Sequence, residues 1–478
     1  MVFSSVVFLF YFLPLFFAAY VLSRFSKWVL LVFSLVFYAW GEPIFIPLML
    51  GMIVANHRFG LQIAGATERR IAKRWLVAGV AVNLAPLILF KYGTFIVQSL
   101  LNVAAAGLTR KFGFSPEAVT IHHLILPLGI SFYTFHSLSY LIDVYRGDVP
   151  AERSLRDLAV YISMFPQLVA GPIIRYKTIA RELHKPFISL ERAAAGAQLF
   201  VIGLSQKVLI ANTVAASADQ IFALPFDQLS TPLSWIGIVC YTMQIYYDFG
   251  GYSNMALGLG LMIGFTFPIN FNYPYVSQSM TEFWRRWHIS LSSWFRDYLY
   301  VPLGGNRISN ARTYFNLCVV FLLCGLWHGA AWTFVAWGAA HGALLVIERL
   351  GLGRVLARAP RPVRHAYVLA AVMATWVLFR SNDLGSAARY LSTMIGAGPE
   401  VAVAPPLHRF LGLDVVIALA AGLLAAGPYG ARWGSRFGKY LTVSSLEVGE
   451  MAAMTCLLML VALSLAGGAY NPFIYFRF

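Results

Sequence analysis

The residues best suited to chemistry are two histidines between Thr281 and Gly342. His288 lies in the aromatic, arginine-rich run FWRRWHISLSSWFRDYLYVPLGGNR, and His328 lies in the apolar run CGLWHGAAWTFVAWGAAHG. A neutral imidazole, with an ordinary pKa of about 6.5, can accept a proton near neutral pH. Full charges at membrane depth cost about 2.5 to 3.5 kcal/mol, so ionisable residues there mark functional sites more often than chance. His328 therefore predicts a catalytic or transport site; the alternative is a core histidine bonded to neighbouring backbone.

Arginines surround His288 on a predicted amphipathic helix from Thr281 to Tyr300. Large apolar residues recur there at three- and four-residue steps, and Arg285, Arg286 and Arg296 lie between them. The simpler interpretation is an interfacial helix whose arginines face lipid headgroups. The alternative is a site for a phosphate-bearing ligand, because a guanidinium matches phosphate with two parallel N–H bonds.

Other polar residues within apolar segments are expected to be structural. His341 is predicted to pack in the core, and Asp143 and Asp248 are predicted to pair with arginines or to cap helix ends. Small residues in the segment after Asp248 predict close helix packing, because backbones approach where side chains are absent; they are Gly258, Gly260 and Gly264.

Composition identifies the class of protein. The chain has 478 residues, of which 59% are hydrophobic and 12% charged, with a mean hydropathy of +0.69, which excludes an ordinary soluble globule. The net charge of +16 comes from Lys and Arg in short loops between apolar runs, a distribution that orients membrane helices and does not indicate nucleic-acid binding. The four cysteines have no metal-ligand spacing, so neither a metal site nor a disulfide framework is predicted.

The sequence predicts an all-α polytopic membrane protein in a single domain, residues 1–478. A broken pair of short spans is expected between Trp28 and Ala55, and three alternatives stay open for Tyr92 to Leu108: a span, a surface helix or a partly buried helix. The other predicted apolar segments are Val6 to Leu22, Trp75 to Phe90, His122 to Val144, Ala193 to Ala211, Pro232 to Tyr247, Tyr246 to Phe265, Tyr314 to Leu326, Ala331 to Ile347, Tyr367 to Phe379, Phe410 to Ala426 and Met451 to Leu465.

Two further segments bear on topology. The basic cluster from Arg69 to Arg74 is expected on the cytoplasmic side, which places the N-terminus outside. The run from Tyr161 to Tyr176 is short and interrupted by Pro166 and Gly171, which predicts a re-entrant or broken helix beside a cavity.

Several signatures, in order along the chain, resemble the membrane-bound O-acyltransferase family, in particular the bacterial branch that acylates alginate and teichoic acid. They are MVFSSVVFLFYFLPLFF, FPQLVAGPIIRY, YYDFGGYSNMALGLG, FNYPYVSQSMTEFWRRWHISLSSWFRDYLYVPLGGNR, GLWHGAAWTFVAWGAAHG and NPFIYFRF. The resemblance implies that His328, in the WHG-type motif, is the essential catalytic residue and that His288 is the second active-site residue. It also implies a ring of about 11 or more transmembrane helices, with re-entrant and interfacial helices, around a central tunnel.

The resemblance implies acyl transfer from a thioester to a hydroxyl in the bacterial inner membrane. The expected donor is acetyl-CoA, no cofactor is permanently bound, and Arg285, Arg286 and Arg296 are candidates for holding the donor phosphates. The expected acceptor is an exported polysaccharide such as alginate, reached directly or through a periplasmic partner resembling SGNH hydrolases, together with the export machinery.

Two alternatives stay open. One is D-alanyl transfer from a carrier protein to a cell-envelope polymer. The other is a proton-coupled transporter or flippase for a lipid-linked sugar, since broken helices and intramembrane histidines also suit that class. A transporter would cleave no thioester, so turnover separates the two.

Overall fold

The computed structural model describes residues 1–112, 125–401, 403–428, 443–468 and 470–472, and these form helices without β-strands. The first half contains η1 (Phe8–Phe12), α1 (Leu13–Leu22), α2 (Lys27–Ala39), η2 (Pro43–Phe45), α3 (Ile46–Gly65), α4 (Arg69–Leu87), η3 (Ile88–Tyr92), α5 (Gly93–Phe112), α6 (Ile130–Arg146), α7 (Leu155–Ser163), α8 (Phe165–Leu168), α9 (Tyr176–His184), α10 (Leu190–Ser205), η5 (Gln206–Ala211) and α11 (Asn212–Phe222). The second half contains α12 (Thr231–Met262), η6 (Pro274–Val276), α13 (Met280–Arg286), α14 (Ile289–Phe295), η7 (Arg296–Tyr300), α15 (Asn310–His328), α16 (Trp332–Ile347), η8 (Glu348–Leu352), α17 (Gly353–Arg358), α18 (Arg361–Arg380), α19 (Leu384–Met394), η9 (Leu407–Arg409), α20 (Leu413–Ala425) and α22 (Val443–Ala466).

Six helical stretches in the described part of the chain are long and apolar enough to cross a membrane. They are Pro43–Gly65, Arg69–Asn102, Leu190–Phe222, Trp332–Arg358, Arg361–Arg380 and Glu447–Ala466, and shorter apolar helices occur at Phe8–Leu22, Lys27–Ala39 and Leu413–Ala425. The predicted all-helical, multi-pass architecture is therefore confirmed. The larger count of spans stays a prediction.

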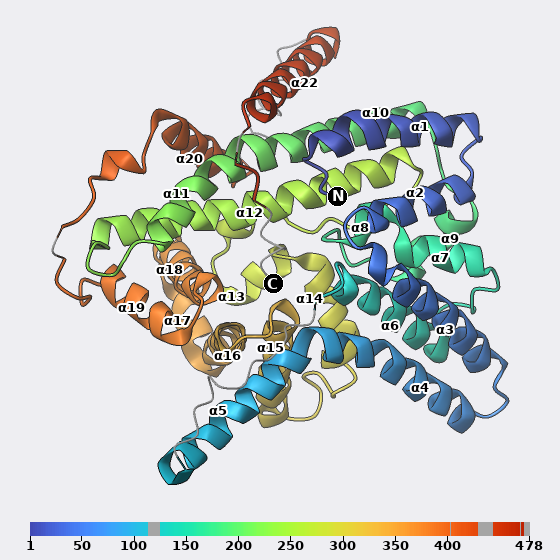
Figure 1. Ribbon diagram of the computed structural model, residues 1–478, viewed down its shortest axis with the longest axis horizontal. Helices are drawn as coiled ribbons and strands as arrows, with labels where there is room; N and C mark the ends of the chain where they lie inside the picture. Colours follow the sequence, from blue (N-terminus) through green and yellow to red (C-terminus); the bar gives the residue numbers. More distant parts are fainter. Residues whose placement is uncertain (113–124, 402, 429–442, 469, 473–478) are drawn as a thin grey trace.

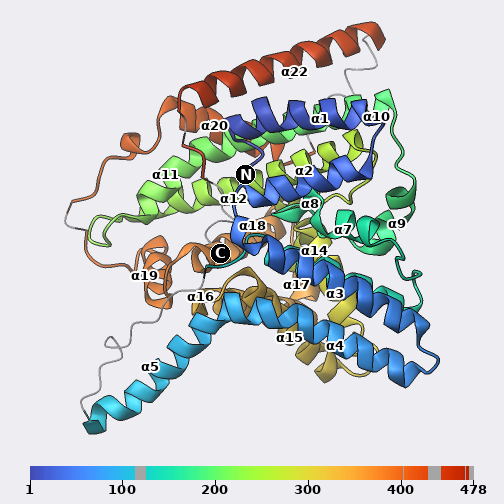
Figure 2. The same cartoon turned by 45° about the vertical axis from the view of Figure 1, so that its right-hand side comes forward.

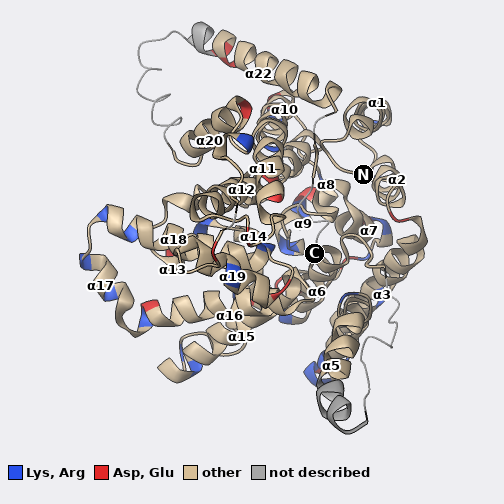
Figure 3. Cartoon of the chain, turned by 60° about the vertical axis from the view of Figure 1, so that its left-hand side comes forward, with Lys and Arg blue, Asp and Glu red and all other residues tan. Residues whose placement is uncertain are grey.

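Short helices at the centre of the molecule are surrounded by long ones. In Figure 1, α13 and α14 lie in the middle, with α12, α6, α15, α16 and α18 around them. Figure 2 shows α22 running along the outside of the layer that contains α1 and α10. Most of the ribbon in Figure 3 is uncharged, and a group of basic residues lies around α17. The motif that contains His288 thus sits inside the helical assembly.

Breaks in the apolar segments fall where proline and glycine predict them. The chain leaves α2 before Gly41 and re-enters a helix through η2, so the predicted break is confirmed, but the second helix is longer than predicted and runs to Gly65. The segment from Tyr161 to Tyr176 is broken between α7 and α8, as predicted, and is almost wholly buried. Protein therefore surrounds this irregular backbone. Backbone of this kind is tolerated at membrane depth only where protein or water satisfies its polar groups.

Two segment predictions need correction or completion. The apolar segments predicted from Pro232 and from Tyr246 form one helix, α12, so Asp248 lies in its middle and not at a helix start. Tyr92 to Leu108, left undecided, continues the α4 helix through η3 into α5. The span predicted from His122 falls partly outside the described residues, and its described helix, α6, begins at Ile130.

Glycines permit the close contact between α10 and α12. A Cβ placed on Gly258 would lie 2.4 Å from the carbonyl oxygen of Gly196, and one on Gly203 would lie 2.5 Å from that of Gly251. Both distances are too short for real atoms, so these positions accept only glycine without movement of the backbone. The predicted role of Gly258 in close helix packing is confirmed.

Candidate active site

His288 lies at a break between two short helices. Its φ of 43° and ψ of 55° are left-handed, so the helix predicted from Thr281 to Tyr300 is interrupted after α13 and resumes as α14. The large apolar side chains of this segment are buried, including Phe283 and Leu291, which corrects the interfacial-helix interpretation. The break directs His288, which is 0% exposed, into the protein interior.

His328 is the last residue of α15. The next residue, Gly329, is extended, so the carbonyls of the final turn lack partners from a following helical turn. The Tyr92 hydroxyl donates to Leu326 O at 2.7 Å, and Lys91 Nζ donates to the carbonyl oxygens of Trp327 and His328, the latter at 3.2 Å. These hydrogen bonds satisfy carbonyl oxygens of the last helical turn, so η3 fixes the helix end that carries His328.

Tertiary structure brings the two histidines together inside an aromatic enclosure. Their ring centroids are 6.4 Å apart. The Trp327 ring lies 6.0 Å from that of His288 and 4.9 Å from that of His328, and Phe379 lies 5.2 Å from His328. Bulk water is thereby limited around the imidazoles, while the spacing leaves both rings able to face one reacting group.

Asn270 is a contact of His288 that motif analysis missed. Its Oδ1 lies 3.0 Å from His288 Nδ1 and accepts hydrogen bonds from Ser290 N and Ser290 Oγ at 3.3 and 2.9 Å. Because backbone Ser290 N–H can only donate, this side-chain atom is an acceptor, and Nδ1 of His288 carries the hydrogen. The sequence held no signal for this contact, because Asn270 lies in a loop 18 positions before His288.

Two cavities border α15 and share no lining residue. A small cavity of about 220 Å³ is bordered by His328, Lys91, Ser131 and Glu42. A larger cavity of about 700 Å³ is bordered by Cys324 and by Ile289, which follows His288, but by neither histidine. Cys324 and His328 are one turn apart on α15, so the two cavities lie against neighbouring turns of the same helix.

The predicted arginines occupy different environments. Arg285 and Arg296 line the large cavity, as does Arg349, which the sequence analysis did not single out. Arg286 does not line it and instead pairs with Glu282 at 2.9 Å. Arg296 is paired with Asp297 at 2.6 Å, whereas Arg285 and Arg349 form no ion pair with any described residue. Two guanidinium groups in the large cavity are therefore available to an anion.

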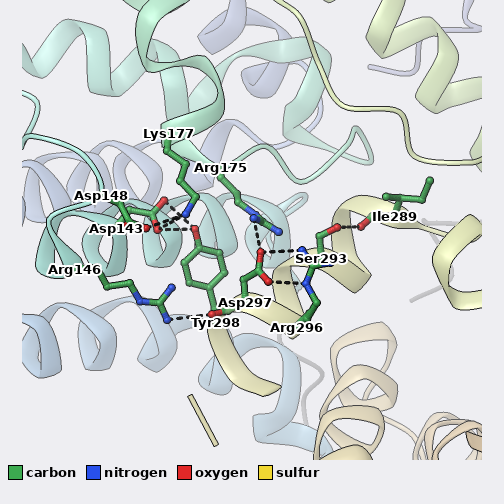
Figure 4. Close-up of polar contacts among 10 residues, drawn as sticks. All are labelled: Asp143, Arg146, Asp148, Arg175, Lys177, Ile289, Ser293, Arg296, Asp297 and Tyr298. Carbon is green, nitrogen blue, oxygen red and sulfur yellow. Dashed lines mark hydrogen bonds and ion pairs between the residues drawn. The ribbon is translucent and has the colours of Figure 1, made fainter. Parts of the chain in front are cut away.

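A network of ion pairs and hydrogen bonds joins residues of α6, α9 and η7 (Figure 4). Asp297 accepts from Arg175 at 2.7 Å, and Tyr298 OH donates to Asp143 at 2.8 Å. Burial raises the pKa of the Asp297 carboxyl, but hydrogen bonding and charge from Arg296 and Arg175 outweigh it and hold that pKa below its ordinary value. The network ties α6 and the segment preceding α9 to η7.

The acidic residues predicted to be structural have lysine or tyrosine partners. Asp143 contacts Tyr298 and lies 3.7 Å from Lys177, and Asp248 pairs with buried Lys207 at 2.6 Å. Asp248 lies in the middle of α12 and Asp143 inside α6, so neither caps a helix end, which corrects that alternative. His341 accepts a hydrogen bond at Nδ1 from Trp284 Nε1 at 3.2 Å, within the aromatic core.

One acidic cluster has ligand atoms close enough to surround a cation. Glu152, Asp157 and His184 bring such atoms within 4.8 Å of one another. Lys27 and Arg156 already bind the two oxygens of Asp157, at 2.7 and 2.8 Å. Cationic side chains therefore already satisfy the carboxylate at the centre of this cluster.

Comparison of the sequence with known proteins identifies its family. The family model for MBOAT, the membrane-bound O-acyltransferases, matches residues 151–381. The chain is 42% identical to the Probable alginate O-acetylase AlgI of Azotobacter vinelandii, with 100% of both chains covered. It is 34% identical to the Peptidoglycan O-acetyltransferase of Helicobacter pylori, over 83% of this chain and 80% of that one. It is 32% identical to the Teichoic acid D-alanyltransferase of Bacillus subtilis, over 47% of this chain and 59% of that one. The predicted resemblance and enzyme class are confirmed, and the chain belongs to the membrane-bound O-acyltransferase family.

Proposed function

We propose that this protein transfers an acetyl group from acetyl-CoA, bound on the cytoplasmic side, to a hydroxyl on the opposite side of the inner membrane. The observation that carries the proposal is the histidine pair, held 6.4 Å apart beside a helix that two separate cavities border. The large cavity is lined by two arginines that form no ion pair with a described residue, and the small cavity is lined by His328. In this proposal the donor and the acceptor approach the histidines from different cavities, joined by the predicted tunnel.

The large cavity is the proposed donor site. Arg285 and Arg349 border it and can bind the phosphates of coenzyme A, because a guanidinium matches phosphate with two charge-assisted hydrogen bonds. Its volume of about 700 Å³ suits the extended arm that carries a thioester. The adjoining network in Figure 4 contains four basic residues, Arg146, Arg175, Lys177 and Arg296, with three aspartates, and this excess of basic residues supports the cytoplasmic assignment.

The small cavity is the proposed acceptor site, and it implies the chemistry of the two histidines. His328 removes the proton from the acceptor hydroxyl, whose oxygen bonds to the thioester carbonyl carbon. His288, whose Nε2 carries no hydrogen, shares the base role. Collapse of the tetrahedral intermediate breaks the carbon–sulfur bond, and the leaving thiolate takes back the proton as coenzyme A. General-base help contributes about 10²–10⁴-fold, so donors to the oxyanion supply further rate enhancement.

The acceptor we propose is an exported polysaccharide such as alginate, reached directly or through a periplasmic hydrolase-like partner. Support comes from the relatives: the alginate O-acetylase covers the whole chain, whereas the D-alanyltransferase covers 47% of it. D-alanyl transfer from a carrier protein is the second candidate. Met1 lies near Gly41, beside Glu42 of the small cavity, so the N-terminus is periplasmic in this proposal.

The test is thioester turnover by purified protein in nanodiscs with radiolabelled acetyl-CoA. Wild type should release coenzyme A and pass label to an added polysaccharide or partner, and His328→Ala should lose at least about a hundred-fold of that rate. His408→Ala, which alters an exposed histidine in η9, is the matched control. Full transfer by folded His328→Ala would refute the assignment, and a donor confined to acylated carrier protein would favour D-alanyl transfer.

A further inference from the structure

We infer that Asn270 is a positioning residue of the reaction, which holds His288 in the tautomer that leaves Nε2 without a hydrogen. This inference rests on the proposed acyl transfer, because it specifies which ring atom of His288 accepts a proton. Asn270 comes from the loop between α12 and η6, and it is 2% exposed. It therefore acts on the reaction only through the histidine.

The atoms around Asn270 determine the tautomer. Oδ1 accepts from Ser290 N–H and from Ser290 Oγ, and Ser290 Oγ in turn accepts from Ile173 N–H at 3.0 Å. The Ser290 hydroxyl therefore directs its hydrogen at Asn270, and the amide cannot be rotated without facing two donors with its own NH₂ group. With Oδ1 fixed, the Nδ1 of His288 must donate, and Nε2 is left with its lone pair.

The backbone supports the same contact. The Ile289 N–H donates to the carbonyl oxygen of Asn270 at 2.9 Å, so main chain and side chain of Asn270 both hold the segment that contains His288. A residue such as His288, with positive φ, needs surrounding structure to maintain that conformation. Asn270 thus fixes the position of the ring as well as its hydrogen.

An aspartate would satisfy the same donors, yet the chain has an asparagine. The Nδ2 of Asn270 is buried and has no hydrogen-bond partner among the described residues, and such a donor is costly. Asparagine retains a benefit that offsets this cost: it orients the imidazole without adding a negative charge that would favour the protonated ring. A neutral orienting group keeps His288 available as a base near neutral pH.

Few titratable groups in the described structure lie close enough to the His288 ring to affect its protonation. The rings of Phe249, Phe271 and Trp327 surround it, at centroid distances of 4.6, 6.4 and 6.0 Å. Among the described residues, His328 on α15 is the titratable group that faces the His288 ring. The basic side chain of Lys91 on η3 donates to the carbonyl oxygen of His328. His341 on α16 contacts Trp284 and lies further along the same core. Asn270 is the polar side chain that contacts the His288 ring directly.

The first test reads the tautomer without using activity. Protein labelled with ¹⁵N in histidine rings, reconstituted in nanodiscs, should show His288 with a protonated Nδ1 and an unprotonated Nε2, the signals being assigned by their loss in His288→Gln. Asn270→Ala should shift or broaden this pair, whereas Asn272→Ala, at an exposed asparagine two positions on, should leave it unchanged. A hydrogen on Nε2 in wild type would overturn the inference.

The second test uses the pH–rate profile of acetyl-CoA turnover. Asn270→Ala should lower kcat at least ten-fold with little change in the donor KM, and Asn272→Ala should match wild type. Asn270→Asp should keep the orientation but move the acid limb of the profile to higher pH, because a carboxylate favours the protonated imidazole. An unshifted limb with normal kcat in Asn270→Asp, or wild-type kcat in folded Asn270→Ala, would overturn the inference. Absence of turnover in wild type would instead refute the proposed function, while the ¹⁵N signals would still decide the tautomer.

Discussion

The imidazole rings of His288 and His328 lie 6.4 Å apart although the residues are 40 positions apart in the chain. His288 lies at a break between two short helices, and His328 is the last residue of a third. Both residues lie at helix ends, and the two rings approach each other there. This arrangement resembles that of active sites in which separate elements supply each group to one reacting centre.

Arg285 and Arg349 are expected to contribute to donor affinity. Replacing either with alanine should raise the KM for acetyl-CoA about ten-fold, because a hydrogen bond to a charged group contributes about 1.5–3 kcal/mol. Initial rates over a range of acetyl-CoA concentrations measure the effect. Arg286→Ala is the matched control, because Arg286 lies outside the large cavity and pairs with Glu282. Equal KM changes in all three variants would contradict the assignment.

The Lys91 cap is expected to stabilise the end of α15. Lys91→Met removes the Nζ group that donates to the carbonyl oxygens of Trp327 and His328, and it should cost about 1–3 kcal/mol, because those acceptors lose their donor. The melting temperature in nanodiscs and kcat should both fall. Tyr92→Phe, which removes only the hydroxyl that binds Leu326 O, should have a smaller effect on both. A larger effect for Tyr92→Phe would argue against the role of Nζ.

The buried pair of Lys207 and Asp248 is expected to tie α12 to η5. The side chains are 1% and 2% exposed, and the Lys207 ammonium also binds Asn212 Oδ1 at 2.8 Å. Lys207→Met removes the ammonium that pairs with the buried Asp248 carboxylate and should destabilise the protein by about 3–5 kcal/mol. The double variant Lys207→Met/Asp248→Asn should recover part of that loss. Chemical or thermal unfolding in detergent measures both, and an additive double variant would show that the two residues do not interact.

Asp157 is expected to make stability depend on pH. Burial raises the pKa of this carboxyl, but hydrogen bonds and charge from Lys27 and Arg156 lower it further, so the folded-state pKa lies below its ordinary value of about 3.9. The stabilisation is therefore present above about pH 4 and lost as the pH falls through the folded-state pKa. Melting temperatures from pH 7 to pH 3 should decline less in Asp157→Asn than in wild type. Parallel curves would exclude a contribution from Asp157.

By itself, the sequence determined the membrane class, most helix positions and the two histidine motifs. Apolar runs, basic loops and the breaks at proline and glycine are local features, so they could be located without a structure; the close approach of Gly258 to α10 was likewise encoded by residue type. The predicted helix from Thr281 to Tyr300 failed at His288, because apolar spacing continues across a break that a single left-handed residue introduces.

Only the tertiary structure decided which residues act together. Periodicity cannot show that Asn270 reaches His288, that Lys91 caps the helix of His328, or that Arg286 lies outside the large cavity while Arg349 lies inside it. Each of these contacts joins residues from separate segments, and their geometry depends on how the helices pack. Sequence patterns record which face of a segment is apolar, whereas the partner of a polar group is set by the three-dimensional position of other segments.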